Sequence, residues 1–374
     1  MNIAINTRFL LKDKLEGIGW FTYETIRRIT CQNPEHRFFF FFDRKFSDEF
    51  IFSQNIQPLV LLPQARHPFL FYLWFEHSVP KALKKVNADL FISTDGFLSL
   101  KADVKTLLVI HDIAFEHFPE TVGKVARWYL GKYSRQFARK ANRIATVSEF
   151  SKQDIVDTYG IASGKIDVVY NGANADYQPH TESESKDVPA KFGLHHDYFI
   201  YAGAIQPRKN LANLLRAFEA FKQNNPGETQ LVIAGRKAWR YEHVFQIHQH
   251  MQFKDDVIFT GHLTTQELSK LVSNAVAMVY VSKFEGFGIP LIEAMNCETP
   301  VITSNVSSMP EVAGDAALLV DPDSVSEIAE AMQKILKDVN LRQSLIKKGN
   351  IQRQKFSWDK TAELLWRSAE RTFQ

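Results

Sequence analysis

Short apolar segments alternate with helical ones along most of the chain, and this alternation restricts the fold more than any other feature. The apolar segments are too short and too uniformly apolar to be half-exposed strands. Strands of this kind, separated by helices, are typical of a parallel sheet that is covered on both faces. In the first half we predict strands at residues 3–6, 38–42, 59–62, 90–93, 106–110, 143–147 and 166–170, and helices at 19–29, 71–86, 123–141 and 151–158.

The second half of the chain repeats the pattern. Residues 174–191 lose the apolar periodicity and are typical of a linker. The predicted fold class is therefore α/β, with two doubly wound Rossmann-like domains at residues 1–175 and 190–356 and a ligand cleft at the carboxyl ends of their strands. The later strands are predicted at residues 198–202, 231–234, 257–260, 276–281, 300–303 and 317–320, and the later helices at 211–223, 266–273, 290–295, 325–336, 341–353 and 357–374.

Composition excludes several classes of protein. A chain of 374 residues with 45% hydrophobic and 23% charged residues is typical of a globular protein of two domains. A formal net charge of +3 gives no indication of nucleic-acid binding. The two cysteines, Cys31 and Cys297, lack metal-site spacing, so we expect two packing residues in a reducing compartment. Without a basic leader or a run of ~20 apolar residues, the expected location is cytoplasmic.

Residues 282–293, Ser-Lys-Phe-Glu-Gly-Phe-Gly-Ile-Pro-Leu-Ile-Glu, follow an apolar strand and open a helix. Gly286 and Gly288 allow the backbone to turn and to approach a ligand. The N–H groups at such a helix start favour an anion, and Glu285 and Glu293 lie on either side of that position. A diphosphate with hydroxyl groups on both sides fits this pattern. For either glutamate alone, a solvated carboxylate or one that complements the helix dipole is an equally good interpretation.

Arg208 and Lys209 occupy a related position, in the turn after the first strand of the second half. Arginine offers a planar fork of donors and lysine a compact charge, and the two together suit a diphosphate. Because the glycine loop also predicts an anion in this half, we favour a phosphate clamp over a solvated corner.

Two further candidates lie in the first half. Gly17 and Gly19 open a helix in a pattern that resembles a dinucleotide fingerprint, but Thr22 stands at the third glycine position and about ten residues separate the strand from the glycines. We favour a glycine loop that approaches a phosphate or sugar over a dehydrogenase, and a plain helix entry remains open. His111 ends an apolar strand, where a hydrogen bond to a substrate hydroxyl and a structural role beside Asp112 are both open.

These pieces together resemble the family 4 (group 1) retaining glycosyltransferases, which have the two-domain GT-B fold. The resemblance rests on the Glu-x7-Glu stretch EGFGIPLIE and the AMNCETPVITSNVSSMPEVAGDAALLVDPDS that follows it. GAIQPRKN, EGIGWFTYE, VIHD, TVSEFSK, VVYNGANADY and FSWDKTAELL support it in matching order along nearly the whole chain. It implies a C-terminal domain that binds the nucleotide sugar and an acceptor-side N-terminal domain, to which the terminal helix at 357–374 crosses back.

The resemblance implies a role for each candidate residue. Glu293 would hold the ribose hydroxyls, and Glu285 would lie beside the donor sugar. Arg208 and Lys209 would neutralise the diphosphate leaving group, so neither a metal nor another cofactor is expected. Gly286, Phe287, Gly288, Gly17 and Gly19 would contact sugar and phosphate through their backbone, and His111 would contact the donor sugar or an acceptor hydroxyl.

The implied activity is retaining transfer of a hexose from a nucleotide-diphosphate sugar to a glycan or lipid-linked acceptor in surface polysaccharide assembly, leaning toward mannose from GDP-mannose. A catalytically silent nucleotide-sugar-binding subunit and an epimerase or phosphorylase on the same fold remain alternatives. The sequence indicates less about which segments bind the acceptor. The aromatic run at 67–75 and the basic, aromatic segment at 124–143 indicate either peripheral contact with the inner membrane surface or a buried helix and a solvated basic face.

Overall fold

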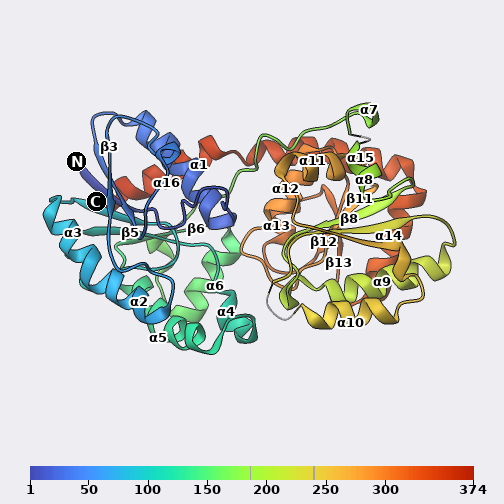
Figure 1. Cartoon of the computed structure of the whole chain (residues 1–374), viewed down its shortest axis with the longest axis horizontal. Coiled ribbons are helices and arrows are strands. Elements are labelled where there is room, and N and C mark those ends of the chain that lie inside the picture. Colours follow the sequence, from blue (N-terminus) through green and yellow to red (C-terminus); the bar gives the residue numbers. More distant parts are fainter. Residues whose placement is uncertain (186, 239–240) are drawn as a thin grey trace. The chain divides into compact units, whose positions relative to one another are not determined.

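The computed structural model describes residues 1–185, 187–238 and 241–374, and the chain divides into two compact units. The first unit comprises Met1–Asn171 with Ser357–Gln374, and the second comprises Gly172–Phe356. Each unit is built around one parallel sheet flanked by helices (Figure 1). The predicted α/β class, with two doubly wound domains, is confirmed.

The first sheet has the strand order β3-β2-β1-β4-β5-β6-β7. Its strand β2 shows why the sequence folds this way, because all five consecutive phenylalanines, residues 38–42, are buried. Successive side chains of a strand point to opposite faces, so a strand that is apolar at every position must be covered on both. The strands are β1 (Asn2–Asn6), β2 (Arg37–Phe42), β3 (Ile56–Val60), β4 (Leu90–Ser93), β5 (Lys105–Ile110), β6 (Arg143–Thr146) and β7 (Ile166–Val168).

The C-terminal helix α16 (Trp358–Glu370) belongs to this first unit, as the resemblance implied. It begins at Ser357, whose hydroxyl accepts from the backbone N–H of Lys360, and it packs along α1. Ser368 Oγ donates to Asp167 Oδ2 over 2.6 Å. The other helices of the unit are α1 (Gly17–Gln32), α2 (Pro68–Leu73), α3 (Val79–Lys85), α4 (Ala114–His117), α5 (Lys124–Lys140) and α6 (Glu149–Tyr159).

Two predicted elements of the first unit differ from those observed. Strand β3 begins at Ile56, three residues before the predicted 59–62. The prediction missed these residues because Gln57 and Pro58 interrupt the apolar pattern. Proline is tolerated at this position because β3 is an edge strand. The single helix predicted at 71–86 consists of α2 and α3 joined by a π-helical turn at Trp74–Ser78.

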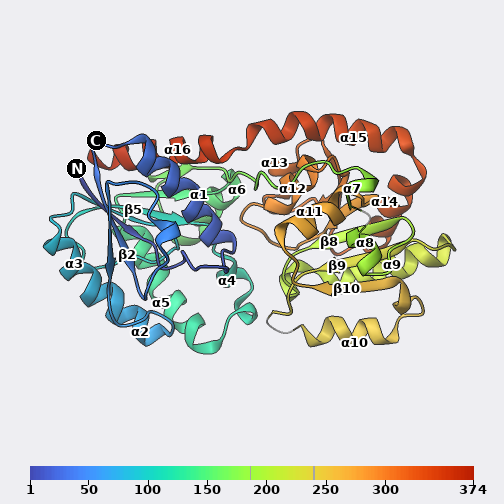
Figure 2. The same ribbon diagram turned by 45° about the horizontal axis from the view of Figure 1, so that its top comes forward.

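The second sheet has the order β10-β9-β8-β11-β12-β13, and Figure 2 shows α9 and α10 on one side of it and α11 and α12 on the other. Its strands are β8 (Tyr198–Ala202), β9 (Gln230–Ala234), β10 (Val257–Gly261), β11 (Ala277–Tyr280), β12 (Val301–Ser304) and β13 (Ala317–Val320). Its helices are α7 (Glu182–Ser185), α8 (Asp187–Lys191), α9 (Leu211–Asn224), α10 (Glu242–His250), α11 (Thr265–Ser273), α12 (Ile289–Asn296), α13 (Met309–Ala313), α14 (Val325–Lys337) and α15 (Val339–Gln352).

The segment predicted as a linker, 174–191, lies in the second unit, where α8 packs against α11. Residue 186 of that segment lies outside the described residues. Of the two cysteines, Cys297 is buried as predicted, but Cys31 is exposed and the prediction that it is a packing residue is wrong. No helix in the described ranges combines the length and the apolar character needed to cross a membrane.

The ends of β8 and β9 approach each other through two glycines, and this approach can be tested. A Cβ at Gly235 would overlap the carbonyl oxygen of Gly203, whereas a Cβ at Gly227 would meet nothing within 4 Å. Gly235→Ala should therefore destabilise the protein by roughly 1–3 kcal/mol, the usual cost of overpacking. Gly227→Ala should leave the urea midpoint unchanged, and equal midpoints for the two variants would contradict this close approach.

Candidate active site

Two loops of the second unit bring the predicted phosphate clamp and the predicted loop glutamate into contact. Arg208 and Lys209 lie in a 3-10 turn that follows β8, and Glu285 lies in the loop that follows β11. Because β8 and β11 are parallel neighbours, their carboxyl ends meet at one edge of the sheet. Arg208 Nη1 lies 2.9 Å from Glu285 Oε2, and Lys209 Nζ lies 2.5 Å from Glu285 Oε1.

Two of these three side chains are buried, and that of Arg208 is partly buried with 17% of its surface exposed. Glu285 is 6% exposed and Lys209 is 9% exposed. Burial opposes ionisation of Glu285, but the adjacent Arg208 and Lys209 outweigh it and lower the pKa of its carboxyl to about 2. One carboxylate thus contacts two cationic side chains at the carboxyl edge of the sheet.

Backbone contacts hold this cluster and the glycine loop in place. Arg208 Nη1 also donates to the carbonyl of Phe284 over 2.8 Å. Ser308 Oγ lies 2.9 Å from the carbonyl oxygens of both Glu285 and Phe287. Gly288 has a φ of 102°, and a Cβ there would collide with the side chain of Met309. Of the two loop glycines, Gly288 is therefore the one that the backbone conformation requires.

Glu293 lies in the second turn of α12, where it is separate from the charged cluster. Its partner is Tyr177, a buried residue of the segment that enters the second unit, and the two side chains are hydrogen-bonded. Burial raises the pKa of Glu293 to about 8, although the hydrogen bond from Tyr177 acts in the opposite direction. The two glutamates of the Glu-x7-Glu stretch therefore have opposite electrostatic environments.

The first-unit candidates lie close to one another around Thr94, which follows β4. Gly17 and Gly19 form the first turn of α1, so the helix begins at the glycines themselves. In the next turn Thr22 Oγ1 donates to Thr94 Oγ1 over 2.8 Å, and His111 Nε2 lies 2.9 Å from the carbonyl oxygen of Thr94. A carbonyl only accepts, so Nε2 carries the proton and Nδ1 is the acceptor of the neutral ring. Burial lowers the pKa of His111.

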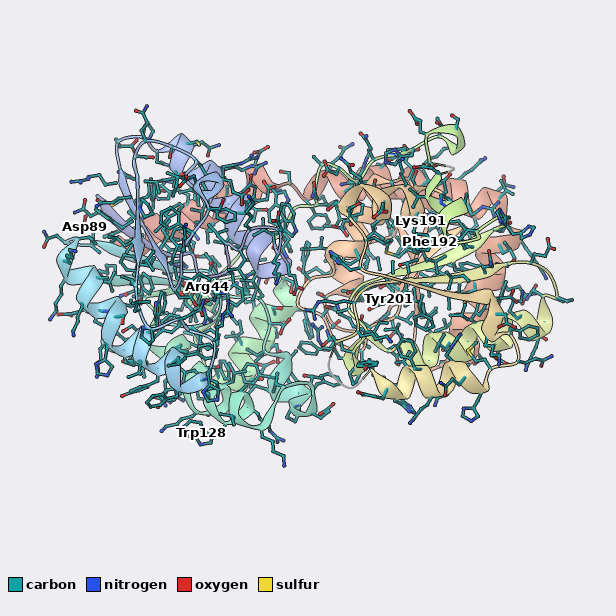
Figure 3. The ribbon with its side chains drawn as sticks, viewed as in Figure 1. Arg44, Asp89, Trp128, Lys191, Phe192 and Tyr201 are labelled. Carbon is teal, nitrogen blue, oxygen red and sulfur yellow. The ribbon has the colours of Figure 1, made fainter. Side chains whose placement is uncertain are left out.

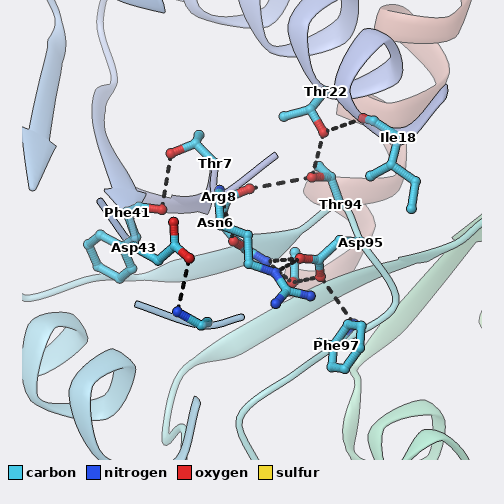
Figure 4. A network of polar contacts seen from close by, with 12 residues as sticks. Asn6, Thr7, Arg8, Ile18, Thr22, Phe41, Asp43, Thr94, Asp95 and Phe97 are labelled. Atoms are coloured by element: carbon cyan, nitrogen blue, oxygen red, sulfur yellow. Dashed lines mark hydrogen bonds and ion pairs between the residues drawn. The ribbon is translucent and has the colours of Figure 1, made fainter. Parts of the chain in front are cut away.

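A second buried ion pair lies at the same edge of the first sheet (Figure 4). Arg8 Nε donates to Asp95 Oδ2 over 2.5 Å, and Asn6 Nδ2 donates to the same oxygen over 2.8 Å. The guanidinium carbon of Arg8 lies within 5.4 Å of the centroids of four aromatic rings, of which Phe97 is the nearest at 4.5 Å. This pair is neutral as a whole and enclosed by aromatic groups, so removing either partner would leave an uncompensated buried charge.

Comparison with known proteins identifies the family. The model of group 1 glycosyl transferases matches residues 184–352, and that of glycosyltransferase family 4 matches residues 15–177. The O-antigen chain mannosyltransferase RfbU of Salmonella typhimurium is 30% identical over 269 residues, which cover 70% of each chain. The chain belongs to the group 1 glycosyltransferases.

Other relatives extend the similarity over almost the full length of this glycosyltransferase. The O-antigen chain mannosyltransferase B of Escherichia coli is 27% identical over 360 residues, which cover 93% of this chain and 94% of the relative. The crystal structure of Anabaena HepE in complex with UDP-glucose aligns with a TM-score of 0.75 at 17% identity and covers 99% of each chain. That structural likeness confirms the GT-B fold.

Several residues at the sheet edges of the two units, each taken by itself, were not found by sequence reasoning. Tyr280 was predicted as part of a buried strand and Tyr177 as part of a linker, so neither was predicted to be a site residue. Arg8 and Asp95 carry no motif, and only the sheet order brings them together. The signal for Tyr280 was its place at the carboxyl end of a predicted strand. Among residues 1–185, 187–238 and 241–374, no group of three or more His, Cys, Asp or Glu side chains is placed to hold a metal ion.

The raised pKa of Glu293 predicts a pH dependence of stability. Between its ordinary value of 4.5 and about 8, Glu293 keeps its proton in the folded state and loses it in the unfolded state. The free energy of unfolding should therefore fall as pH rises through this window, because the folded state binds more protons. Glu293→Gln should remove this contribution, so its urea midpoint should fall less than that of the wild type between pH 5 and pH 8.

Glu285→Gln is the matched control for this experiment. The pKa of Glu285 is lowered to about 2, so its stabilising contribution is lost only as pH falls below 4.5 toward that value. This variant should be less stable than the wild type but should show the same slope between pH 5 and pH 8. Parallel midpoints for wild type and Glu293→Gln would contradict the protonated state of Glu293.

Proposed function

We propose that this glycosyltransferase transfers a hexose from a nucleotide-diphosphate sugar to a glycan or lipid-linked acceptor in surface polysaccharide assembly, with retention of the anomeric configuration. The observation that carries the proposal is the Arg208–Lys209–Glu285 cluster, in which two cationic side chains lie beside a glycine loop and a helix start. Mannose is the proposed sugar and GDP-mannose the proposed donor, and the two relatives named as O-antigen chain mannosyltransferases support this choice.

The chemistry required is the departure of a nucleoside diphosphate. As the bond between the anomeric carbon and the phosphate oxygen breaks, negative charge builds on the diphosphate and positive charge on the sugar. Arg208 and Lys209 are already oriented when the donor binds, so they stabilise that negative charge without reorganisation. Because these cations serve the role that a divalent metal has in other transferases, we propose that the reaction is independent of metal.

The two glutamates divide the binding of the donor between them. Glu293, one turn inside α12, accepts from the ribose hydroxyls, and Tyr177 holds its carboxyl in place. Glu285 fixes the two cations and lies in the glycine loop beside the donor sugar. The roles of Gly17, Gly19 and His111 in contacting diphosphate and sugar stay predictions that rest on the family resemblance.

A basic and aromatic surface on the first unit supports peripheral contact with an anionic membrane. Helix α5 has no acidic residue, and α2 packs against it. Trp128 on α5 is 60% exposed and points away from the ribbon (Figure 3), and Phe69 on α2 is 64% exposed. Cationic side chains around exposed aromatic rings suit a surface of anionic lipid. The exposed basic residues of α5 are Lys124, Arg127, Lys132, Arg135, Arg139 and Lys140.

The donor reaction is tested with purified protein and single nucleotide sugars. GDP-mannose should release GDP, and the rate should be the same in excess EDTA. Lys209→Ala should lower kcat/KM by roughly 10²-fold or more, the usual effect of removing one preorganised contact to developing charge. Loss of the rate in EDTA with recovery in Mg²⁺ would contradict the metal-independent mechanism. Nucleotide-sugar binding without turnover with any donor or acceptor would favour a catalytically silent subunit.

The lipid surface is tested by sedimentation with vesicles. The wild type should bind phosphatidylglycerol vesicles at low salt and should bind phosphatidylcholine vesicles much more weakly, because the basic face attracts anionic lipid. Trp128→Ala should weaken binding by roughly tenfold, corresponding to about 1.4 kcal/mol. Ile351→Ala is the matched control, because Ile351 is 67% exposed on the second unit. Equal binding to both lipids, or equal losses in both variants, would contradict this surface.

A further inference from the structure

Three buried residues of the first unit have polar atoms to which no described residue is hydrogen-bonded. Arg8 and Glu76 are each 5% exposed, and Tyr129 is 2% exposed. Arg8 Nε donates to Asp95, but within the described part of the chain Nη1 and Nη2 form no hydrogen bond. Glu76 Oε1 accepts from the backbone N–H of Leu100 over 2.8 Å, whereas its Oε2 and the Tyr129 hydroxyl form no hydrogen bond with a described residue. None of these atoms is sealed from solvent, so the small exposed part of each side chain includes its polar end.

The three polar ends lie around one aromatic side chain, the partly buried Phe97 in the loop after β4 (Figure 4). The guanidinium carbon of Arg8 lies 4.5 Å from the centroid of the Phe97 ring, and the centroid of the Tyr129 ring lies 6.0 Å from it. Glu76 follows Phe75, whose ring stacks on Phe97 with centroids 5.7 Å apart and an angle of 14° between the planes. Burial and then the nearby Glu76 carboxylate raise the pKa of Tyr129, which is consistent with a carboxylate close to this hydroxyl.

An irregular turn of the backbone brings Glu76 to this position. Residues Trp74–Ser78 form a π-helical turn between α2 and α3, and such turns are frequent at functional sites. The turn buries three consecutive residues, Trp74, Phe75 and Glu76, whereas a regular surface helix buries one stripe of side chains. Because a buried carboxylate with few hydrogen bonds is costly, its remaining oxygen favours a ligand that donates hydrogen bonds.

The chemistry of these groups suits a neutral sugar. The charged groups are one guanidinium, that of Arg8, and two carboxylates, those of Asp95 and Glu76, so no excess of cations is offered to an anion. The guanidinium N–H groups donate to hydroxyl oxygens, Glu76 Oε2 accepts from hydroxyl groups, and a tyrosine hydroxyl does either. Aromatic rings with a few placed polar groups are typical of small-molecule sites, and the Phe97 ring suits the C–H face of a sugar ring.

We propose that Arg8, Glu76 and Tyr129 bind a neutral sugar residue of the acceptor, with its C–H face against Phe97, and that Glu76 disfavours anionic sugars. The assignment to the acceptor rests on the proposed function. Of the two sugar substrates of that reaction, the donor carries a diphosphate, which two carboxylates disfavour. The site therefore deepens the proposed function by stating the chemical class of the acceptor.

The first test compares Tyr129→Phe with Tyr159→Phe in ligand-observed NMR titrations with methyl glycosides of neutral hexoses, methyl α-mannoside among them. GDP is present throughout to occupy the cluster on the second unit. Tyr129→Phe should weaken binding by roughly 3- to 10-fold, the usual effect of losing one hydrogen bond. Tyr159 is also 2% exposed, but its hydroxyl donates to Glu116 over 3.0 Å, so Tyr159→Phe should keep the wild-type affinity.

The second test measures charge selectivity with methyl glucuronide, an anionic sugar. Glu76→Gln removes one carboxylate, so the affinity for methyl glucuronide relative to the neutral glycoside should rise by roughly tenfold or less, the range of one charge interaction near a protein surface. Glu35→Gln is the matched control, because the Glu35 side chain is 62% exposed on the same unit, and it should keep the wild-type ratio. Melting temperatures of all four variants show whether any substitution acts through stability.

Four results would overturn the inference: no binding of any neutral glycoside to the wild type, an unchanged affinity in Tyr129→Phe, an equal loss in both tyrosine variants, or an unchanged ratio in Glu76→Gln. Calorimetry with GDP-mannose tests the assignment to the acceptor, because Tyr129→Phe should keep the wild-type affinity for the donor and a parallel loss would contradict it. Failure of the proposed function is distinguishable, since the wild type would then bind neutral glycosides through Tyr129 without transferring a sugar from any donor.

Discussion

The structure of the second unit depends on one constraint, which is the burial of Lys209 and Glu285 beside the partly buried Arg208 at a single edge of the sheet. Charges are costly to bury unless they are paired, and breaking a buried pair leaves an uncompensated charge. Glu285 supplies the paired charge for Arg208 and Lys209. The pKa of its carboxyl is lowered, so the attraction of the two cations outweighs the effect of burial on Glu285. The same two cations are the groups that we propose contact the anionic leaving group.

The location of this cluster follows from the order of the strands. Strand β8 lies between β9 and β11. From β8 the chain continues to β9 on one side, and it later forms β11 on the other side of β8. Such a switch point separates the following loops and opens space for a ligand. The first sheet has the same arrangement, with β1 between β2 and β4, and it also carries a buried pair there, Arg8 with Asp95. The two groups differ in composition: the first is one cation with one carboxylate enclosed by aromatic rings, whereas the second has two cations on one carboxylate.

Sequence reasoning recovered what is local in the chain. Apolar strands, glycine loops and helix starts have periodic or positional signals, so both sheets and the loops that carry Glu285 and Arg208 were predicted from the sequence. Sequence reasoning failed where a polar or proline residue interrupts the apolar strand pattern, as at Pro58 in the edge strand β3. It also failed where side chains meet only after folding. Tyr177 illustrates the second case, because its segment lacks apolar periodicity yet supplies the partner of Glu293. The opposite pKa shifts of the two glutamates could not be predicted either, since both depend on burial and on neighbours distant in sequence.

We propose that Arg208 and Lys209 bind the phosphate of the donor that lies farther from the nucleoside. Calorimetry should compare the nucleoside diphosphate with the matching monophosphate, for the base that stabilises the protein most in a thermal-shift panel. The wild type should bind the diphosphate much more tightly than the monophosphate. Lys209→Ala should lose most of that difference while its affinity for the monophosphate stays near the wild-type value. A variant that keeps the full preference for the diphosphate would contradict the account.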